Sequence, residues 1–308
     1  MYMGVSNSNT TAKSDVRKRA MTDREIYLNR YAESKVVQNL GQAHSGAELN
    51  LTLHEGRLVV CKQMPLTDRT WKSLDKQTTF PALENVRPVE IIRRRALLDR
   101  VEVLMPLVRG VVGVDYVTSL SIDDVISFCH SLHLLLSRLR NNATPSDSHH
   151  HMIQKKIEEL YSHHSIGKSY RKLLNHLSLE IQNIASIPIG PCHGDLTLGN
   201  MIFVKSTKAI HLIDFLDTYL ESPLIDLAKL EQDLVFGWSS RYENHEVRLR
   251  AKILGAHVFE GLRILDPQDE RLFNVFRILN TLRILPYCKD AVTEKWVHYV
   301  ISQQENVL

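Results

Sequence analysis

The stretch that decides the fold is Cys192-His193-Gly194-Asp195-Leu196-Thr197-Leu198-Gly199-Asn200-Met201-Ile202-Phe203, which is followed by Ile213-Asp214-Phe215. Residues 201–204 and 209–213 are short apolar runs on either side of a polar turn, so the pattern predicts a β-hairpin. A hairpin returns the chain to the point where it began. We therefore expect Asn200, just before the first strand, to lie close to Asp214, just after the second.

The polar side chains around this hairpin suit a phosphate-bound metal ion. An amide oxygen beside a carboxylate suits Mg²⁺, which takes oxygen ligands and keeps waters and substrate phosphates in its shell. Asp195 comes five residues before Asn200, so we expect it one loop away, where a base can orient an acceptor hydroxyl toward a γ-phosphate. The alternative is that Asp195 caps a turn and Asn200 takes a left-handed conformation. That alternative does not explain Asp214 across the same hairpin, so the pattern favours phosphoryl transfer.

His193-Gly194-Asp195 with Asn200, and the Ile-Asp-Phe at Asp214, carry a family resemblance. They resemble the catalytic and metal-binding segments of the aminoglycoside phosphotransferase and choline kinase superfamily, small-molecule relatives of protein kinases. Protein kinases have Arg where this chain has Gly194, and the Gly form looks like the small-molecule branch. The resemblance implies that Asp195 is the catalytic base and that Asn200 and Asp214 hold Mg²⁺. It also implies an α+β, two-lobed protein-kinase-like fold, with a small antiparallel β-sheet lobe and a larger, mainly helical lobe.

The amino-terminal part of the chain has the pattern of a nucleotide-binding sheet. Residues 35–40, 47–53 and 57–62 predict three strands, which we expect to form an antiparallel meander. The loop before the second strand would cover the nucleotide phosphates, with Ser45 and Gly46 binding the cofactor. Lys62 ends the third strand and matches the superfamily lysine that neutralises these phosphates, although a lone lysine is more often a surface residue.

The same resemblance implies an acidic partner for Lys62 on the next helix. Residues 67–79 carry side chains at helical spacing, and Pro81 marks the end of this helix. Asp75 is the acid best placed on it, and we predict Asp75 as the partner. Glu84, beyond Pro81, is the alternative, and either acid could instead be a solvated charge.

Residues 100–110 predict a strand that leads into a hinge between the lobes. In the superfamily this segment binds the adenine through backbone groups, so Met105 and Leu107 are expected to line the purine pocket. Both side chains would serve equally well in a core. The sequence leaves ATP and GTP open as the nucleotide.

The rest of the chain is mostly helical, with apolar residues at three- and four-residue spacings in 122–140, 152–161, 170–184, 247–264, 270–284 and 293–303. We expect a flexible segment at 1–34, a nucleotide-binding lobe with its hinge at 35–110, and a mainly helical catalytic and substrate lobe at 111–308. The Asp-Leu-Ala segment at Asp226 resembles the start of the superfamily helix beneath the catalytic loop. The resemblance implies that Asp226 accepts backbone N–H bonds around His193 and supports the loop.

Composition restricts the class of protein further. The 308 residues are 44% hydrophobic, enough for a sizeable core in two lobes. A formal charge of +3 is too small to indicate nucleic-acid binding, and no run approaches the roughly 18 to 20 apolar residues that span a bilayer. The four scattered cysteines are typical of reduced thiols. We therefore predict a cytoplasmic protein with no nucleic-acid or membrane partner, and the oligomeric state stays open. Arg93-Arg94-Arg95 predicts a solvated edge, with a phosphate or an acidic partner as alternatives.

The acceptor is the least defined part of the prediction. Six acidic residues and one lysine lie between Asp214 and Asp233, which could favour a cationic acceptor or could be metal ligands and solvated faces. Trp238 and Tyr242 could line an acceptor pocket or pack between helices. We predict an ATP- and Mg²⁺-dependent kinase of a small hydroxyl-bearing molecule, with a sugar or polyol ahead of an amino alcohol. The competing hypothesis is a nucleotide-binding pseudokinase or scaffold protein that transfers no phosphate.

Overall fold

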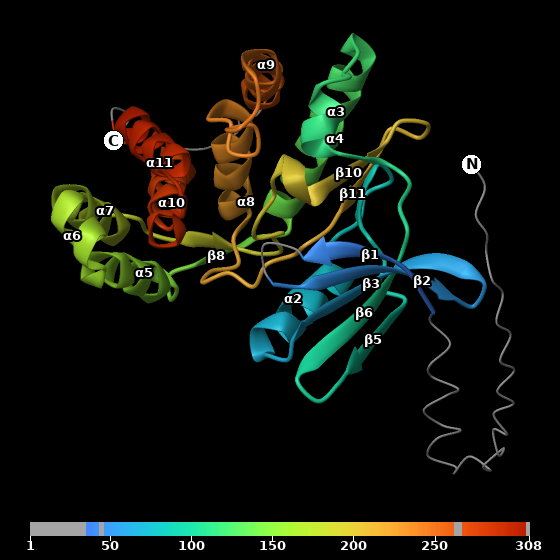
Figure 1. Cartoon of the computed structure of the whole chain (residues 1–308). Coiled ribbons are helices and arrows are strands. Elements are labelled where there is room, and N and C mark those ends of the chain that lie inside the picture. Colours follow the sequence, from blue (N-terminus) through green and yellow to red (C-terminus); the bar gives the residue numbers. More distant parts are fainter. Residues whose placement is uncertain (1–34, 43–45, 262–266, 306–308) are drawn as a thin grey trace, which may run out of the picture.

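The computed structural model describes residues 35–42, 46–261 and 267–305. Figure 1 shows two lobes, with a sheet and the helix α2 (Asp68–Thr79) in one and the long helices in the other. This is the two-lobed, protein-kinase-like α+β architecture that the sequence predicted. Within the described ranges, no helix is both long enough and apolar enough to cross a bilayer.

The first lobe is built on a five-stranded antiparallel sheet. Its strands follow the spatial order β1 (Lys35–Gln42), β2 (Glu48–His54), β3 (Arg57–Pro65), β6 (Arg100–Pro106) and β5 (Arg93–Ala96). The predicted meander of three strands is confirmed. The turn between β2 and β3 is Glu55-Gly56, where both residues have positive φ (48° and 72°), the backbone twist that suits a two-residue hairpin.

Strand β5 lies where the sequence predicted a solvated edge. Arg93 and Arg95 both reach the Glu102 carboxylate, at 3.3 and 3.2 Å. Arg94, between them, pairs instead with Asp75 on α2. Alternate side chains of a strand point to opposite faces, so the triplet reaches acids on both sides of the sheet. Arg94 and Arg95 stay 42% and 37% exposed on this edge strand, in agreement with the predicted solvated edge.

A second sheet connects the lobes, in the order β4 (Val86–Pro88), β11 (Ala209–Leu212), β10 (Met201–Val204) and β7 (Val111–Val112). β10 and β11 pair antiparallel, with Met201 opposite Leu212, so the predicted hairpin is confirmed. β4 precedes the hinge and runs parallel to β11, whereas β7 follows the hinge and pairs with β10. The hairpin is therefore held on both edges by strands that flank the hinge. A short third pair joins β8 (Thr144–Ser146) to β9 (Ile187–Ile189).

The second lobe is mainly helical, as predicted. Its helices are α3 (Gly113–Val117), α4 (Ile122–Asn141), α5 (His150–Ser162), α6 (His164–Ser169), α7 (Arg171–Gln182), α8 (Pro223–Leu230), α9 (His245–Gly261), α10 (Pro267–Leu282) and α11 (Ala291–Glu305). Single turns occur at Leu198–Asn200 and Leu285–Tyr287, and a π-helical turn at Glu231–Val235 continues α8. The carboxyl end of the helix predicted at 247–264 lies outside the described residues.

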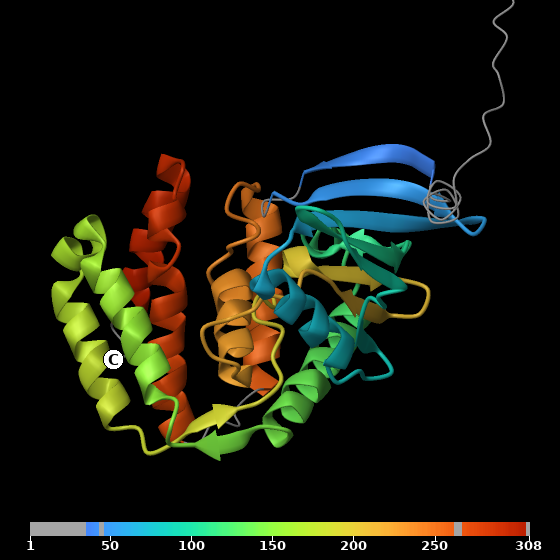
Figure 2. The ribbon, with the colours of Figure 1, turned by 90° about the horizontal axis from the view of Figure 1, so that it is seen from below.

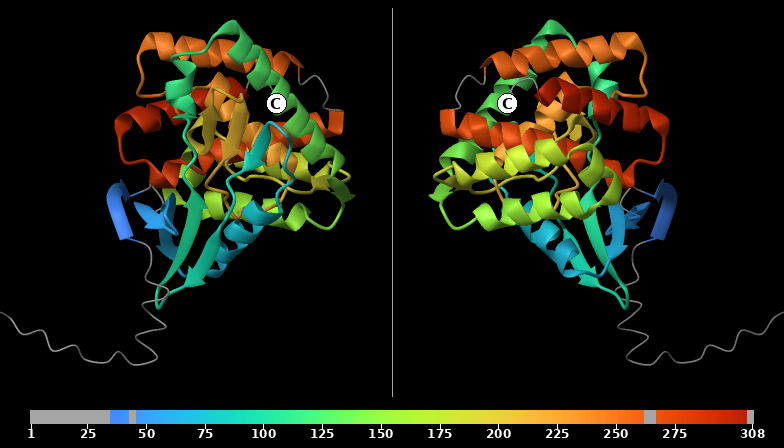
Figure 3. Two further views of the ribbon diagram at one scale, coloured as in Figure 1. Left: turned by 90° about the vertical axis from the view of Figure 1, so that its right-hand side faces the viewer. Right: turned by 90° about the vertical axis from the view of Figure 1, so that its left-hand side faces the viewer.

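The long helices share one core. On α4 the buried Leu132, Leu135 and Leu139 recur every three or four residues, which places them on one face, and a capping box between Ser121 and Asp124 starts the helix. Figure 2 shows α5, α6 and α7 beside α10 and α11, at the end of the molecule away from the first lobe. Figure 3 shows α9 next to α4, and the two helices pack against each other. The hairpin thus sits between a sheet lobe and a rigid helical lobe.

Candidate active site

The β10–β11 hairpin brings the predicted metal ligands together. The backbone N–H of Ile213 donates to the carbonyl oxygen of Asn200 at 3.0 Å, so Asn200 and Asp214 are neighbours across the open end of the hairpin. Asp214 has φ 60°, a left-handed conformation that is uncommon outside glycine and turns the chain sharply after β11. The juxtaposition expected from the hairpin is therefore present.

The amide of Asn200 fixes the loop that carries Asp195. Its Nδ2 donates to the backbone carbonyl of Asp195 at 2.8 Å and to Oδ2 of the same residue at 3.0 Å. Because the amide nitrogen is committed to Asp195, Oδ1 of Asn200 is the atom left to accept a cation. Asn200 thus links the expected base to the expected metal position.

Lys229 on α8 is a site residue that the sequence analysis missed. Its Nζ lies 3.2 Å from Oδ1 of Asp195, and its side chain is 16% exposed. Burial alone would raise the pKa of Asp195, but Lys229, His193 and Asn200 together outweigh it and lower that pKa. Asp195 is therefore held as a carboxylate. A lysine one helical turn after Asp226 was the available signal, because both residues then face the loop above the helix.

His193 is a structural residue of the loop and is fully buried. Its Nδ1 accepts from the backbone N–H of Asp195 at 3.2 Å, which leaves Nε2 to donate to the carbonyl oxygen of Ile213 at 2.8 Å. Burial lowers the pKa of His193 to about 4, so the ring is neutral near pH 7. The imidazole therefore joins the catalytic loop to the strand that precedes Asp214.

Two buried carboxylates hold the backbone of the loop. Asp226 accepts from the N–H groups of His193 and Gly194 at 2.5 and 2.7 Å, which is the predicted contact. Asp233 accepts from Leu198 at 2.5 Å and from the backbone N–H of Ser239 at 2.6 Å. Burial raises the pKa of Asp226 to about 7 and also raises that of Asp233. The role of Asp233 was missed, because it depends on a π-helical turn that the sequence pattern does not specify.

Gly194 explains why this loop has glycine where protein kinases have arginine. Its φ is +90°, and a Cβ here would collide with the carbonyl oxygen of Leu216 and lie 2.7 Å from Cγ2 of Thr218. The segment after Asp214 passes directly over this position. A larger residue would displace that segment from the loop.

Lys62 lies beside Asp214. Its Nζ is 2.5 Å from Oδ1 of Asp214, and the lysine side chain is 10% exposed. The second oxygen of Asp214 and Oδ1 of Asn200 make a hard-oxygen donor pair, which fits Mg²⁺ when phosphate and water complete the shell. In the described part of the chain, no group of three or more His, Cys, Asp or Glu side chains gathers at a metal site. A cation held here would thus depend on oxygen ligands from the substrate.

The structure does not bring Asp75 to Lys62, which corrects the sequence prediction. Asp75 lies on the outer face of α2, is 59% exposed and pairs with Arg94 of β5. The small cavity that Lys62 lines contains Ser73, Leu74 and Gln77 from α2, and none of these is an acid. The spacing of residues in 67–79 predicted the helix correctly. It could not predict which face of the helix is turned toward Lys62. Glu84, the alternative partner, is exposed.

The other predicted nucleotide residues lie on the first lobe. Met105 is 8% exposed, packs with Leu74 in the small core under the sheet, and also lines the cavity beside Lys62. Leu107 is half-buried just after β6. Gly46 has φ +75° and open space around its Cα. Ser45 lies outside the described residues.

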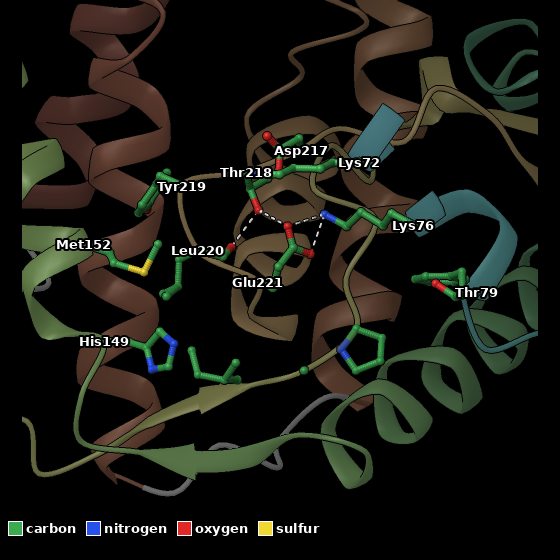
Figure 4. A pocket seen from close by; sticks show the side chains of 14 residues that line it. Lys72, Lys76, Thr79, His149, Met152, Asp217, Thr218, Tyr219, Leu220 and Glu221 are labelled. Carbon is green, nitrogen blue, oxygen red and sulfur yellow. Dashed lines mark hydrogen bonds and ion pairs between the residues drawn. The ribbon is translucent and has the colours of Figure 1, made fainter. Parts of the chain in front are cut away.

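The segment after Asp214 anchors α2 to the second lobe. Lys76 donates to the carbonyl oxygen of Leu216 at 2.8 Å and pairs with Glu221 at 2.6 Å. The backbone of Asp217 is held by Ser73 and Arg69 of α2. Figure 4 shows Lys76, Asp217 and Glu221 at the edge of a cavity of about 570 Å³, whose far side is formed by His149 and Met152. This cavity adjoins the loop that carries Asp195, because Gly190 and Pro191 are among its lining residues.

Trp238 and Tyr242 contact a cation that belongs to the protein. The guanidinium of Arg241 lies 3.9 Å from the ring centre of Trp238 and 4.4 Å from that of Tyr242. The Trp238 ring also packs on Trp296, with centroids 5.2 Å apart. Trp238 and Tyr242 thus each pack one ring face against Arg241 of the same lobe. This agrees with the alternative that they pack within the lobe.

These features define the class of protein before any comparison. A sheet lobe, a helical lobe and an Asp-Asn-Asp set around one hairpin are the parts of a kinase-like phosphotransferase. The family model described as "Phosphotransferase enzyme family" matches residues 83–255, which is more than half of the chain. This protein belongs to that family. No curated protein matches it.

Solved structures share the fold at low sequence identity. The GDP complex of wild-type aminoglycoside 2'-phosphotransferase-IIIa is 14% identical, with a TM-score of 0.61 over 93% of this chain and 100% of that one. A thermostable mutant of aminoglycoside phosphotransferase APH(4)-Ia, with AMP-PNP and hygromycin B, is 11% identical, with a TM-score of 0.60 over 93% and 98% of the two chains. A GDP and kanamycin complex of an APH(2") enzyme is 15% identical, with a TM-score of 0.58 over 91% and 95%.

Proposed function

We propose that this protein is an ATP- and Mg²⁺-dependent phosphotransferase that moves the γ-phosphate to a hydroxyl of a small molecule. The observation that carries the proposal is the grouping of Asp195, Asn200, Asp214 and Lys62 around one hairpin. Membership of a phosphotransferase family supports the reaction class. Structures of similar fold with GDP or AMP-PNP support a nucleotide as the phosphate donor.

The metal and the nucleotide would be held by the residues next to the hairpin. Oδ1 of Asn200 and the second oxygen of Asp214 are the proposed Mg²⁺ ligands. The bound ion would neutralise charge on the phosphates. Lys62, which pairs with Asp214 at 2.5 Å, is placed to contact the phosphates from the sheet side. Gly46, Met105, Leu107 and Ser45 are proposed as further nucleotide contacts.

Asp195 is proposed as the base that orients the acceptor hydroxyl. Its lowered pKa makes it a weak proton acceptor, so its main contribution is to align the hydroxyl with the γ-phosphate. This is sufficient for a loose phosphoryl transition state, in which the nucleophile needs little early deprotonation. Lys229 keeps Asp195 ionised and adds positive charge beside the transferred group.

A sugar or polyol is proposed ahead of an amino alcohol as the acceptor. A quaternary or protonated amine would bind best over a free aromatic face. Arg241 already covers faces of Trp238 and Tyr242, which disfavours a second cation there. Solved structures of similar fold hold the aminoglycosides kanamycin and hygromycin B, which carry sugar hydroxyls as well as amines.

The direct test is nucleotide consumption with Mg²⁺ against a panel of sugars, polyols, amino alcohols and aminoglycosides. ATP and GTP should be compared as donors for each acceptor. Acceptor-dependent turnover that stops when Mg²⁺ is chelated would support the proposal. Turnover without any acceptor, or transfer that persists in chelator, would contradict it.

A nucleotide-binding pseudokinase is the second candidate. One observation favours it: no acid of α2 lines the cavity beside Lys62, so the phosphate clamp lacks the partner expected of an active kinase. This candidate predicts saturable ATP binding with no transfer to any acceptor in the panel. The intact set of Asp195, Asn200 and Asp214 opposes it.

A further inference from the structure

A second cavity, of about 420 Å³, lies between α9, α11 and the segment at 236–241. Five basic side chains line it, counting the histidine: Arg241, His245, Arg248, Lys252 and Lys295. No Asp or Glu is among its lining residues. None of the proposed catalytic or nucleotide-binding residues lines it either, so it is a separate site.

The basic residues come from helix faces that meet at the cavity. On α9, His245, Arg248 and Lys252 are three and four residues apart, so they share one face. On α11, Lys295 lies beside Trp296, and Tyr299 follows one turn later. The two helices therefore present a basic face and a mixed basic and aromatic face to the same space.

These cations differ from those elsewhere on α9. Within the described structure, the side chains of Arg248, Lys252 and Lys295 form no ion pair or hydrogen bond. Arg250 of the same helix, outside the cavity, pairs with Glu246 at 2.9 Å. Arg248, Lys252 and Lys295 are all solvent-exposed, so an anion can reach them in the cavity without first displacing an acidic partner. The cavity is thus complementary to a negatively charged ligand.

The walls of the cavity are held in place before any ligand binds. Nε1 of Trp296 donates to the carbonyl oxygen of Phe236 at 2.7 Å. Arg241 donates to the carbonyl oxygen of Trp238 at 2.7 Å and to Oγ1 of Thr293 at 3.3 Å. A fixed indole and a fixed guanidinium reduce the entropy cost of binding.

We propose that this cavity binds a sugar phosphate. Arginine and lysine match phosphate oxygens, while Trp296 and Tyr299 offer aromatic surface against which a sugar ring can pack. A volume of about 420 Å³ falls within the range of small-molecule pockets. The site stands on its own residues and does not require the proposed catalytic function.

The site is physically connected to the catalytic loop. Asp233 accepts from Ser239, in the segment that forms one wall, and from Leu198, in the loop that carries Asp195. A ligand in the cavity therefore contacts an element that shares one carboxylate with the catalytic loop.

The test is isothermal titration calorimetry of the full-length chain with glucose 1-phosphate, glucose and inorganic phosphate as separate probes. Arg248→Gln and Lys252→Gln each remove one cavity charge, and Arg250→Gln removes one charge from the same helix outside the cavity. We expect glucose 1-phosphate to bind more tightly than either fragment, and each cavity variant to weaken it about tenfold. Arg250→Gln should leave its affinity unchanged.

Three results would overturn the proposal. One is that the unmodified chain binds none of the probes. Another is that Arg250→Gln weakens glucose 1-phosphate as much as the cavity variants do, which would indicate general electrostatic attraction. The third is that inorganic phosphate binds as tightly as glucose 1-phosphate, which would remove the sugar from the assignment. Circular dichroism of each variant would show that the fold is intact.

Discussion

The catalytic loop and the cavity between α9 and α11 are both rich in charge, but they use charge differently. Around the loop each acid has a partner: Asp195 has Lys229, Asp214 has Lys62, and Asp226 has two backbone N–H groups. In the cavity, Arg248 and Lys252 have none within the described structure. The paired carboxylates fix the geometry of the loop, whereas the unpaired cations of the cavity are available to an anionic ligand. Substitutions in the loop should therefore change stability and turnover. Substitutions in the cavity should change only the affinity for its ligand.

Apart from removal of the proposed base Asp195, the largest effect is expected from removing a proposed metal ligand. Asp214→Asn keeps the shape of the side chain but loses the carboxylate that pairs with Lys62 and is proposed to bind Mg²⁺. Turnover should fall by about 10²- to 10³-fold, the usual cost of losing one electrostatic group at the reacting centre. The measurement is the rate of acceptor-dependent ATP consumption as a function of Mg²⁺ concentration. A rate and a Mg²⁺ dependence equal to those of the native chain would exclude Asp214 as a ligand.

A smaller effect is expected from Lys229→Met, which keeps most of the side-chain length. The loss of a charge-assisted contact of about 1.5 to 3 kcal/mol should lower kcat about 10- to 100-fold. Lys229 also lowers the pKa of Asp195, so the acid limb of the pH–rate profile should move to higher pH in the variant. A loss of rate without movement of that limb would show that Lys229 acts on folding alone.

Asp226→Asn tests the structural support of the loop. One N–H group would face the new amide NH₂ instead of an oxygen, which should lower the free energy of unfolding by about 1 to 3 kcal/mol. Urea unfolding measures this loss, with Asp147→Asn, an exposed loop aspartate, as the matched control. An unchanged stability would mean that the two N–H contacts contribute nothing.

The same variant should change the pH dependence of stability. Between about pH 4 and 7 folded Asp226 keeps a proton that the unfolded chain has lost, so its contribution to stability falls as pH rises. His193 acts in the opposite sense, because its pKa is about 4 when folded and 6.5 when unfolded. The two contributions offset each other in the native chain. In Asp226→Asn the stability should rise from pH 4 to 6.5 by up to about 1.4 kcal/mol per pH unit. A slope equal to the native one would contradict the assigned protonation states.

The smallest effects belong to charges at the surface. Asp75→Asn breaks an exposed pair with Arg94, and should change stability by less than about 1 kcal/mol and turnover not at all. By comparison, Arg248→Gln should leave the unfolding free energy within about 0.5 kcal/mol of the native value, because in the described part of the chain the Arg248 side chain forms no ion pair or hydrogen bond that the substitution could break. Thermal unfolding and steady-state rates check both. A large loss of turnover in Asp75→Asn would restore that residue as a partner of Lys62.

Patterns of residues that are close in sequence predicted the parts of the structure that depend on local backbone geometry. The hairpin, the neighbouring Asn200 and Asp214, and the strands β1, β2, β3 and β6 of the first sheet follow from alternation and turn residues close in sequence. The partner of Lys62 could not be found in this way, because it depends on how α2 is rotated against the sheet. Lys229 and Asp233 come from a helix and a π-helical turn that are distant in sequence from the loop they support, and Asp233 lies 35 residues beyond its partner Leu198. Their roles arise only from tertiary packing.

Charge also concealed one element of secondary structure. Arg93, Arg94 and Arg95 suggested a solvated edge, and they form the edge strand β5, which pairs with β6 and places acids within reach on both faces. The cavity between α9 and α11 was missed for a related reason. Its basic residues are spread over three segments, and no single segment shows an unusual charge.

The measurement that tests the central claim most directly compares turnover and nucleotide binding in Asp195→Asn. Asp147→Asn serves as the matched control, assayed with the best acceptor from the panel. We predict that Asp195→Asn loses acceptor-dependent turnover by about 10²- to 10⁴-fold while ATP affinity stays unchanged, because Asp195 is proposed to orient the acceptor and not the nucleotide. Unchanged phosphorylation of the acceptor by this variant would contradict the account.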